Sequence, residues 1–231
     1  MIVFLIAIIV IIGIILFFQR KEKGNVNIEF SKKVAPYTKT EEENFRFEAA
    51  EELNISSISS NLVLKQEECS EIYVKLLKKV GDTSEEHLEE ELAHIICKMV
   101  DGILEIGMEK GYQTAVNSKY MKAELIIPEK VKSLNIVSQT GDVEVDGSYD
   151  KIAIDSNTGD IKLNISDLDT EDNILLNGKI GNVNIKLPKQ SKIKLCGSQQ
   201  NNVKLGDGIL QDEDGTVIEV NKSTSRIKIV S

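Results

Sequence analysis

The apolar residues of this chain begin with one unbroken run. Residues 1–18 carry no charged or polar side chain. A helix over this run is about 27 Å long at ~1.5 Å per residue, close to the ~30 Å hydrocarbon thickness of a bilayer. The run lacks the basic start and the small-residue cleavage site of a secretory signal. The sequence therefore predicts a transmembrane helix at 1–18 that stays attached, with the lipid bilayer as its partner.

Residues 19–44 follow without a sustained periodicity, and we interpret them as a basic juxtamembrane linker. Arg20, Lys21 and Lys23 stand directly behind the apolar run, where they suit contact with anionic lipid headgroups. Positive charge beside a span tends to remain in the cytoplasm. Taken alone, this charge flank predicts a cytoplasmic C-terminal part.

From residue 45 the pattern changes to short alternations of apolar and polar residues, separated by Gly, Asn, Asp and Ser. Alternations of this length that are rich in β-branched residues indicate strands. They predict strands at 54–58, 61–64, 71–76, 103–106 and 123–127.

A helical pattern interrupts these strands at residues 83–96. Leu88, Leu92, Ile95 and Ile96 recur at helical spacing, behind a Ser/Thr cap position and acids in the first turn. We expect one amphipathic helix here, inserted into the β region and lying against its edge.

The second half of the β region contains an internal repeat. Segments 134–145 and 152–163 share the pattern Ser-x-Thr-Gly-Asp followed by alternating apolar residues, and their threonines are eighteen residues apart. A third, looser copy lies at 174–185, and a fourth at 193–205 keeps only the strand–turn–strand order. Two more alternating runs follow at 216–220 and 226–230.

Each clear copy of the repeat places a turn at the same phase. Glycine permits a positive φ there, and the Asp or Asn behind it can hydrogen-bond the turn backbone. One unit cannot bury its apolar face alone, whereas stacked units of ~18–22 residues share a continuous core. This period suits a β-solenoid or a meander of hairpins, and the aromatic content of only 5% favours the solenoid. The repeat assigns as turn residues Thr140, Gly141, Asp142, Thr158, Gly159, Asp160, Gly181 and Asn182.

These motifs also carry a resemblance to a known family. Segments 138–145 and 156–163, preceded by 123–128 and 134–137, are similar to the putative-adhesin domain of bacterial envelope proteins, which includes LiaG-like membrane proteins. The resemblance covers residues 45–231. It implies a mainly β fold, a single-stranded right-handed β-solenoid behind one N-terminal span, with no catalytic residues to transfer. It also implies a domain outside the cytoplasm, and we favour this placement over the one that the charge flank predicts.

The composition limits which classes of partner and cofactor the chain can have. The chain has 28 Lys and Arg against 37 Asp and Glu, a net charge of −9, which argues against nucleic acid as the main partner. Cys69, Cys97 and Cys196 lack the spacing of a disulfide framework, and we interpret them as ordinary, buried thiols. The sequence contains no motif that calls for a cofactor.

Two pairs of residues are candidates for metal or acid–base chemistry. His87 and His94 are seven residues apart, whereas two imidazoles on one helix grip a metal ion at i, i+4. We therefore expect surface histidines. Asp142 and Asp160 would stack ~5 Å apart on neighbouring coils, as a Ca²⁺ site, an acid–base pair or turn residues. We favour the turn role, so the sequence predicts no metal site and no catalytic residue.

Three functions fit these observations. We favour a non-catalytic, membrane-anchored β-solenoid that mediates envelope interactions or serves as a stress or signalling accessory, with a protein or an envelope polymer as its partner. The alternative is a scaffold that polymerises at the membrane, as bactofilin-like proteins do, because open solenoid ends expose strand edges. The third is a polysaccharide-active β-helix enzyme, which needs several acids and a strong base in one groove.

Overall fold

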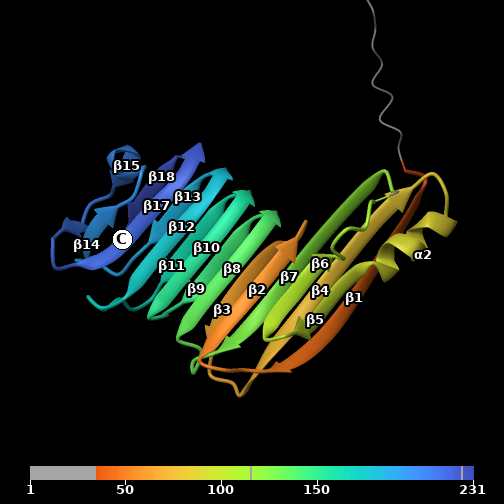
Figure 1. Cartoon of the computed structure of the whole chain (residues 1–231), viewed down its shortest axis with the longest axis horizontal. Helices are drawn as coiled ribbons and strands as arrows, with labels where there is room; N and C mark the ends of the chain where they lie inside the picture. The colour runs from red at the N-terminus through yellow and green to blue at the C-terminus, as the bar shows by residue number, and fades with distance from the viewer. Residues whose placement is uncertain (1–34, 115, 225) are drawn as a thin grey trace, which may run out of the picture. The chain divides into compact units, whose positions relative to one another are not determined.

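Alternating apolar and polar residues build strands over most of the chain that the structure describes. This computed structural model describes residues 35–114, 116–224 and 226–231. They form two sheets of nine strands each, one α-helix and one 3-10 turn (Figure 1). The elements are β1 Tyr37–Glu48, β2 Glu52–Ile58, β3 Asn61–Glu67, β4 Glu71–Asp82, α2 Glu86–Ala93, β5 Ile95–Val100, β6 Ile103–Met108, β7 Ser118–Pro128, β8 Ser133–Thr140, β9 Val143–Gly147, β10 Lys151–Thr158, β11 Ile161–Ile165, β12 Asn173–Ile180, β13 Val183–Lys186, β14 Lys192–Cys196, η1 Gln200–Asn202, β15 Val203–Leu205, β16 Leu210–Gln211, β17 Thr216–Thr224 and β18 Ile227–Val230.

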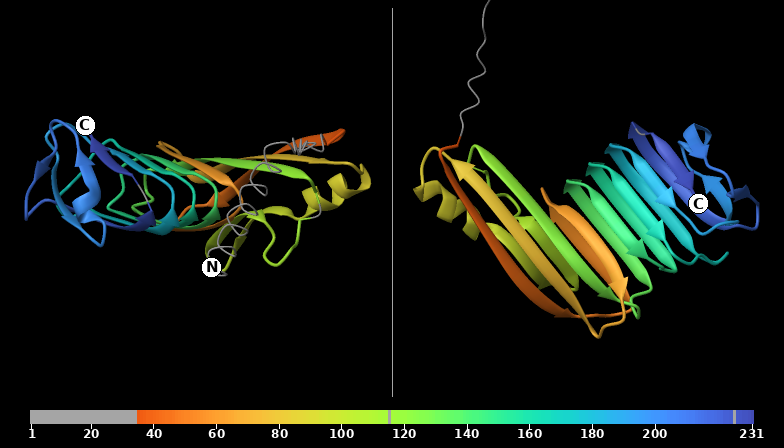
Figure 2. Two further views of the ribbon diagram at one scale, coloured as in Figure 1. Left: turned by 90° about the horizontal axis from the view of Figure 1, so that it is seen from above. Right: turned by 180° about the vertical axis from the view of Figure 1, so that it is seen from behind.

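The two sheets lie face to face with the apolar core between them (Figure 2). Sheet A has the strand order β1-β4-β7-β3-β9-β11-β13-β18-β15, and sheet B has the order β16-β14-β17-β12-β10-β8-β2-β6-β5. Successive strands of the repeat alternate between the sheets, so β8 and β9 form one coil and β10 and β11 form the next. Neighbouring coils pair in parallel. The fold is therefore mainly β and solenoid-like, and the meander alternative is wrong.

Equivalent residues of successive coils form aliphatic ladders along the core. Each of the following side chains is at most 3% exposed. The sheet B ladder contains Leu53, Leu134, Ile152, Ile174 and Ile218, and the sheet A ladder contains Leu62, Val143, Ile161, Val183 and Ile227. Burying one such side chain contributes ~1.5–3 kcal/mol. These ladders fill the space between the sheets with Ile, Val and Leu, in agreement with the low aromatic content.

The order of the coils in space differs from their order in the chain. The coil of β2 and β3 lies beside β8 and β9, and Figure 1 shows it as orange ribbon beside green strands. The segment between them forms one end of both sheets, where β6 and β7 lie next to the β2–β3 coil and β1, β4 and β5 lie beyond. At the other end, β17 and β18 insert between β12–β13 and β14–β15. The sequence alone does not reveal these insertions, because long-range backbone pairing decides them.

The predicted elements are mostly confirmed. The five strands predicted before residue 128 form parts of β2, β3, β4, β6 and β7. The helix predicted at 83–96 is shorter, since α2 spans Glu86–Ala93 and the next strand begins at Ile95. Leu88 and Leu92 of α2 are buried, and the helix packs against β4 and β5, the latter an edge strand of sheet B.

The linker predicted at 19–44 is wrong at its C-terminal end. Strand β1 begins at Tyr37 and pairs antiparallel with β4 along its whole length. Residues 37–44 lack an apolar alternation, so this part of the strand has no sequence signal of its own and depends on its backbone partner. The predicted span at 1–18 and the linker at 19–34 lie outside the described residues. Within the part that the structure describes, no helix has the length and apolar character needed to cross a membrane.

Candidate binding surface

The repeat turns form a hydrogen-bonded ladder along one edge of the coils. Asn61 is the first residue of β3, and Asp142, Asp160 and Asn182 stand directly before β9, β11 and β13, the sheet A strands of the neighbouring coils. The Asp142 backbone N–H donates to Asn61 Oδ1 at 2.9 Å, and the Asp160 N–H donates to Asp142 Oδ1 at 2.8 Å. The Asn182 N–H continues the series to Asp160 Oδ1 at 2.7 Å. Each carboxylate thus accepts a backbone hydrogen bond from the next coil.

The glycines of these turns stand where neighbouring backbones approach closely. Gly141 has a φ of 129° and Gly159 a φ of 142°. A Cβ on Gly159 would lie 2.1 Å from the carbonyl oxygen of Gly141, and a Cβ on Gly181 would lie 2.0 Å from that of Gly159. Thr140 and Thr158 precede the first two glycines and pair with each other across β8 and β10. A residue without a side chain is therefore needed at this point of each coil.

A buried lysine that no sequence motif predicts connects three of the coils. Lys222 of β17 is fully buried, and its Nζ donates to the carbonyl oxygens of Gly159 at 2.8 Å and Ser156 at 3.3 Å. Gly178 lies between Lys222 and Ser156 in the register and has no side chain, so the lysine can reach across it. Burial lowers the pKa of Lys222, against the opposite effect of the Asp160 carboxylate. The sequence does hint at its burial, because Lys222 continues the alternation of the inward residues Ile218 and Val220 along β17.

The two histidines lie at opposite ends of α2, and each contacts a different carboxylate. His87 Nδ1 lies 2.8 Å from Asp82 Oδ2, and His94 Nδ1 lies 2.9 Å from Glu109 Oε2. The Thr83 backbone N–H and the His87 ring lower the pKa of Asp82, and the His94 ring lowers the pKa of Glu109. Among the described residues, no group of three or more His, Cys, Asp or Glu side chains is placed to hold a metal ion.

The three cysteines are free thiols that differ in burial. Cys97 is buried, and this burial raises the pKa of its thiol to about 12. Cys69 and Cys196 are partly exposed, so the prediction of buried thiols is correct only for Cys97.

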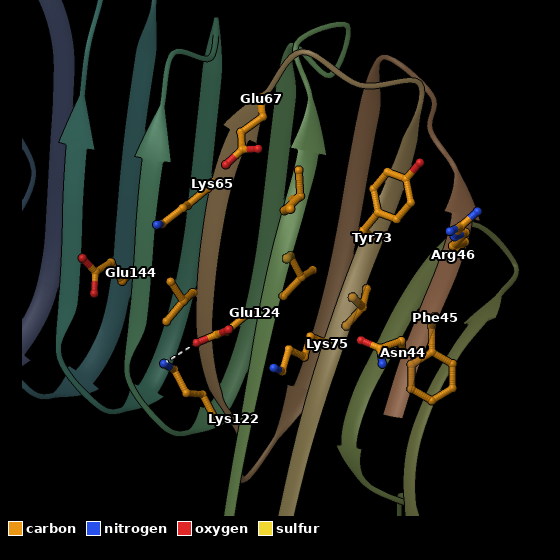
Figure 3. Close-up of a pocket in the computed structure, with 14 residues that line it drawn as sticks. Asn44, Phe45, Arg46, Lys65, Glu67, Tyr73, Lys75, Lys122, Glu124 and Glu144 are labelled. Atoms are coloured by element: carbon orange, nitrogen blue, oxygen red, sulfur yellow. Dashed lines mark hydrogen bonds and ion pairs between the residues drawn. The ribbon is translucent and has the colours of Figure 1, made fainter. Parts of the chain in front are cut away.

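The outer face of sheet A is hollowed where β1, β4, β7, β3 and β9 lie side by side (Figure 3). We call this feature the sheet-A hollow, and its volume is about 800 Å³. Tyr73, Ile126 and Lys65 form one row across three strands, and Lys75, Glu124 and Val63 form the row beside it. Its charged lining residues are Arg46, Lys65, Lys75, Lys122, Glu67, Glu124 and Glu144.

The lining of the sheet-A hollow combines an aromatic ring with charges of both signs. The guanidinium carbon of Arg46 lies 5.1 Å from the centre of the Tyr73 ring. Lys122 Nζ donates to Glu124 Oε1 at 2.6 Å, the dashed line in Figure 3. This hydrogen bond lowers the pKa of Glu124 and raises the pKa of Lys122. The hollow therefore offers a stacking surface together with cationic donors and anionic acceptors for a polar ligand.

No sequence pattern assigns a residue to the sheet-A hollow. The alternation of segment 71–76 does place Tyr73 and Lys75 on one face of their strand. Their neighbours Ile126 and Glu124 come from a strand some fifty residues further on. Only the strand pairing shows that these side chains share one surface.

The described fold resembles solved structures of bacterial proteins. A putative cell adhesion protein from Clostridium sporogenes has 17% identity and a TM-score of 0.51, over 83% of this chain and 98% of that one. A putative adhesin from Bacteroides fragilis has 13% identity and a TM-score of 0.37, over 84% of this chain and 98% of that one. No family model and no curated protein matches the sequence. The first of these structures confirms, for the fold alone, the resemblance that the repeat motifs indicated.

Proposed function

We propose that this protein is a non-catalytic β-solenoid, right-handed as the family resemblance implies, that residues 1–18 anchor in the cell membrane. Its β domain lies outside the cytoplasm and binds a component of the cell envelope, as an interaction module or a stress-response accessory. The contact site is the sheet-A hollow.

The sheet-A hollow is the observation that carries this proposal. Apolar side chains with a few polar groups around them are the usual lining of a binding site, and Val63, Ile126 and Tyr73 stand here among lysines and glutamates. A polar polymer or a peptide can stack on the Tyr73 ring and pair with the charges at its rim.

The charges of the hollow suit recognition better than proton transfer. Glu124 is paired with Lys122, and Glu144 lies 2.5 Å from Lys162 Nζ. The lowered pKa of Glu124 makes this carboxyl a poor general acid near neutral pH. We therefore rank binding above the hydrolysis of a polysaccharide.

Site-specific crosslinking in cells tests the proposal. A photo-reactive amino acid replaces Tyr73 in the full chain, and a matched variant carries it at Asn157, an exposed position of β10 in sheet B. We expect a defined crosslinked product from position 73 that weakens when Lys75→Glu is added, and no such product from position 157. The same products from both positions, or none from position 73, would contradict a binding role of the hollow.

A second candidate function is a scaffold that polymerises at the membrane. Among the described residues, strand β1 is an edge strand of sheet A over twelve residues, and such an edge can pair with another chain. Glu41, Glu42 and Glu43 charge this edge, however, and charged edges oppose such pairing. Sedimentation velocity of the full chain in detergent decides between the candidates: growth of large species with concentration supports the scaffold, and one constant species supports binding.

A further inference from the structure

The outer face of sheet A changes character beyond the sheet-A hollow. Strands β11, β13, β18 and β15 are neighbours there, and their inward residues are the core aliphatics. Their outward side chains include four exposed lysines and no carboxylate. We call these four, Lys162, Lys186, Lys204 and Lys228, the lysine face.

The strand register aligns three of the four lysines. Lys162 and Lys228 lie on either side of Asn184, and Lys204 pairs directly with Lys228. With strands about 4.8 Å apart, this row extends about 14 Å along the stack of coils. Like charges directly opposite each other on neighbouring strands destabilise a sheet. Folding stability therefore does not account for the pair of Lys204 and Lys228.

Among the described residues, three of the four lysines of the lysine face lack the acidic partners found elsewhere on the molecule. At the same end of sheet B, Lys192 lies 3.0 Å from Asp212 and Lys194 lies 3.0 Å from Glu213. On the lysine face, Lys162 pairs with Glu144 at the border of the hollow. Among the described residues, no ion pair of the other three lysines is found. A chain with a net charge of −9 thus keeps one surface positive.

A second hollow lies at the end of the same strands. It has a volume of about 430 Å³ and includes Asn164, Ser166, Lys186, Lys189 and Ser231, together with Asp146. Hydroxyl, amide and ammonium groups of this kind can hydrogen-bond a neutral polyol or sugar unit. The row of lysines offers a site for anionic groups, and this hollow offers a site for a neutral group beside it.

We propose that the lysine face binds a linear polymer in which phosphodiester groups alternate with polyol or sugar units. Ammonium groups bind phosphate as point charges, and the negative charge of the rest of the chain disfavours contact of a polyanion with its other surfaces. A flat anionic bilayer would meet the lysines but leave the second hollow unfilled, so the observations favour a polymer. The inference rests on the proposed function, because it names the class of envelope component that this domain contacts.

Binding of a defined polymer tests the inference. The full chain is placed in nanodiscs of phosphatidylcholine, and labelled poly(glycerol phosphate) is titrated by fluorescence anisotropy at several salt concentrations. The test variant is Lys204→Glu with Lys228→Glu. The control is Lys192→Glu with Lys194→Glu, which changes the net charge equally on the opposite sheet. We expect the test variant to bind at least ten times more weakly, the control to bind within twofold of the parent, and the affinity to fall with added salt.

Three results would overturn the inference. One is an equal loss in both double variants, which would reveal only a net-charge effect. Another is the absence of polymer binding, or equal binding of neutral dextran. The third is binding of phosphatidylglycerol vesicles that needs Lys204 and Lys228 while the polymer does not bind, which would assign this face to a bilayer. Each of these leaves the Tyr73 crosslinking result unchanged, so failure of the inference is distinguishable from failure of the proposed function.

Discussion

Replacing Gly159 by Ala tests how closely the coils approach. The added Cβ would lie 2.1 Å from the carbonyl oxygen of Gly141. Carbon and carbonyl oxygen atoms on neighbouring strands normally lie about 3.3 Å or more apart. The two coils must therefore separate by about 1 Å, or the turn must rotate.

Two effects contribute to the expected loss of stability. A side chain at the φ of +142° costs about 1–3 kcal/mol. Separation of these two coils also weakens the hydrogen bond of 3.0 Å from the Gly141 N–H to the Thr158 carbonyl. This bond contributes about 1 kcal/mol. We expect Gly159→Ala to lower the free energy of unfolding by about 2–4 kcal/mol.

Gly102 provides a matched control. Its φ is +78°, and an added Cβ would have no heavy atom within 4 Å. Gly102→Ala should therefore cost only the backbone strain, about 1–2 kcal/mol. Urea unfolding of the full chain in detergent, followed by circular dichroism, measures both variants. If Gly159→Ala costs no more than Gly102→Ala, the close approach of the turns is refuted.

The remaining predictions concern single contacts. Asp142→Ala removes the acceptor of the Asp160 N–H and should lower the free energy of unfolding by about 1 kcal/mol, whereas Asp142→Asn keeps an acceptor and should lose less; equal losses in urea unfolding would contradict this. The folded state lowers the pKa of Lys222, so the unfolded chain binds that proton more tightly. Stability of the parent relative to Lys222→Met should therefore rise as the pH increases toward the unfolded value near 10.5, and a flat difference would refute the buried ammonium. Asp82 and Glu109 have lowered pKa values, so their stabilisation is present above the unfolded carboxyl pKa of ~4 and is lost as the pH falls through the folded values. Hydrogen exchange of the α2 amides should accelerate over that acidic range, and His94→Ala should remove the part due to Glu109; unchanged exchange would contradict the pairing.

The repeat made the central coils predictable because each copy has the same local pattern of strand and turn residues. Strand residues alternate, and glycine marks the place where two backbones meet. Residues 53–64 form a further coil that the sequence does not identify as a copy of the repeat. It places Ser57 and Asn61 where the next coil has Ser138 and Asp142, but it lacks the Thr-Gly-Asp signature. Its distance of 81 residues from its spatial neighbour hides it further.

The sheet-A hollow and the lysine face were not predictable in this way. Their side chains point away from the core, so core packing does not constrain which residues stand there. Hydrophobic periodicity therefore does not assign them to a common surface. Lys204 and Lys228 are adjacent only because β18 inserts between β13 and β15. Likewise, Arg46 reaches Tyr73 only because β1, which was interpreted as linker up to residue 44, pairs with β4.

Orientation of the β domain tests the central claim most directly. Lys110→Cys adds a thiol at an exposed turn position behind β6, and a membrane-impermeant maleimide reports its side of the membrane in intact cells. We predict labelling of intact cells above that of the unsubstituted chain and equal to labelling after lysis. Protection in intact cells with full labelling after lysis would contradict an extracytoplasmic binding domain.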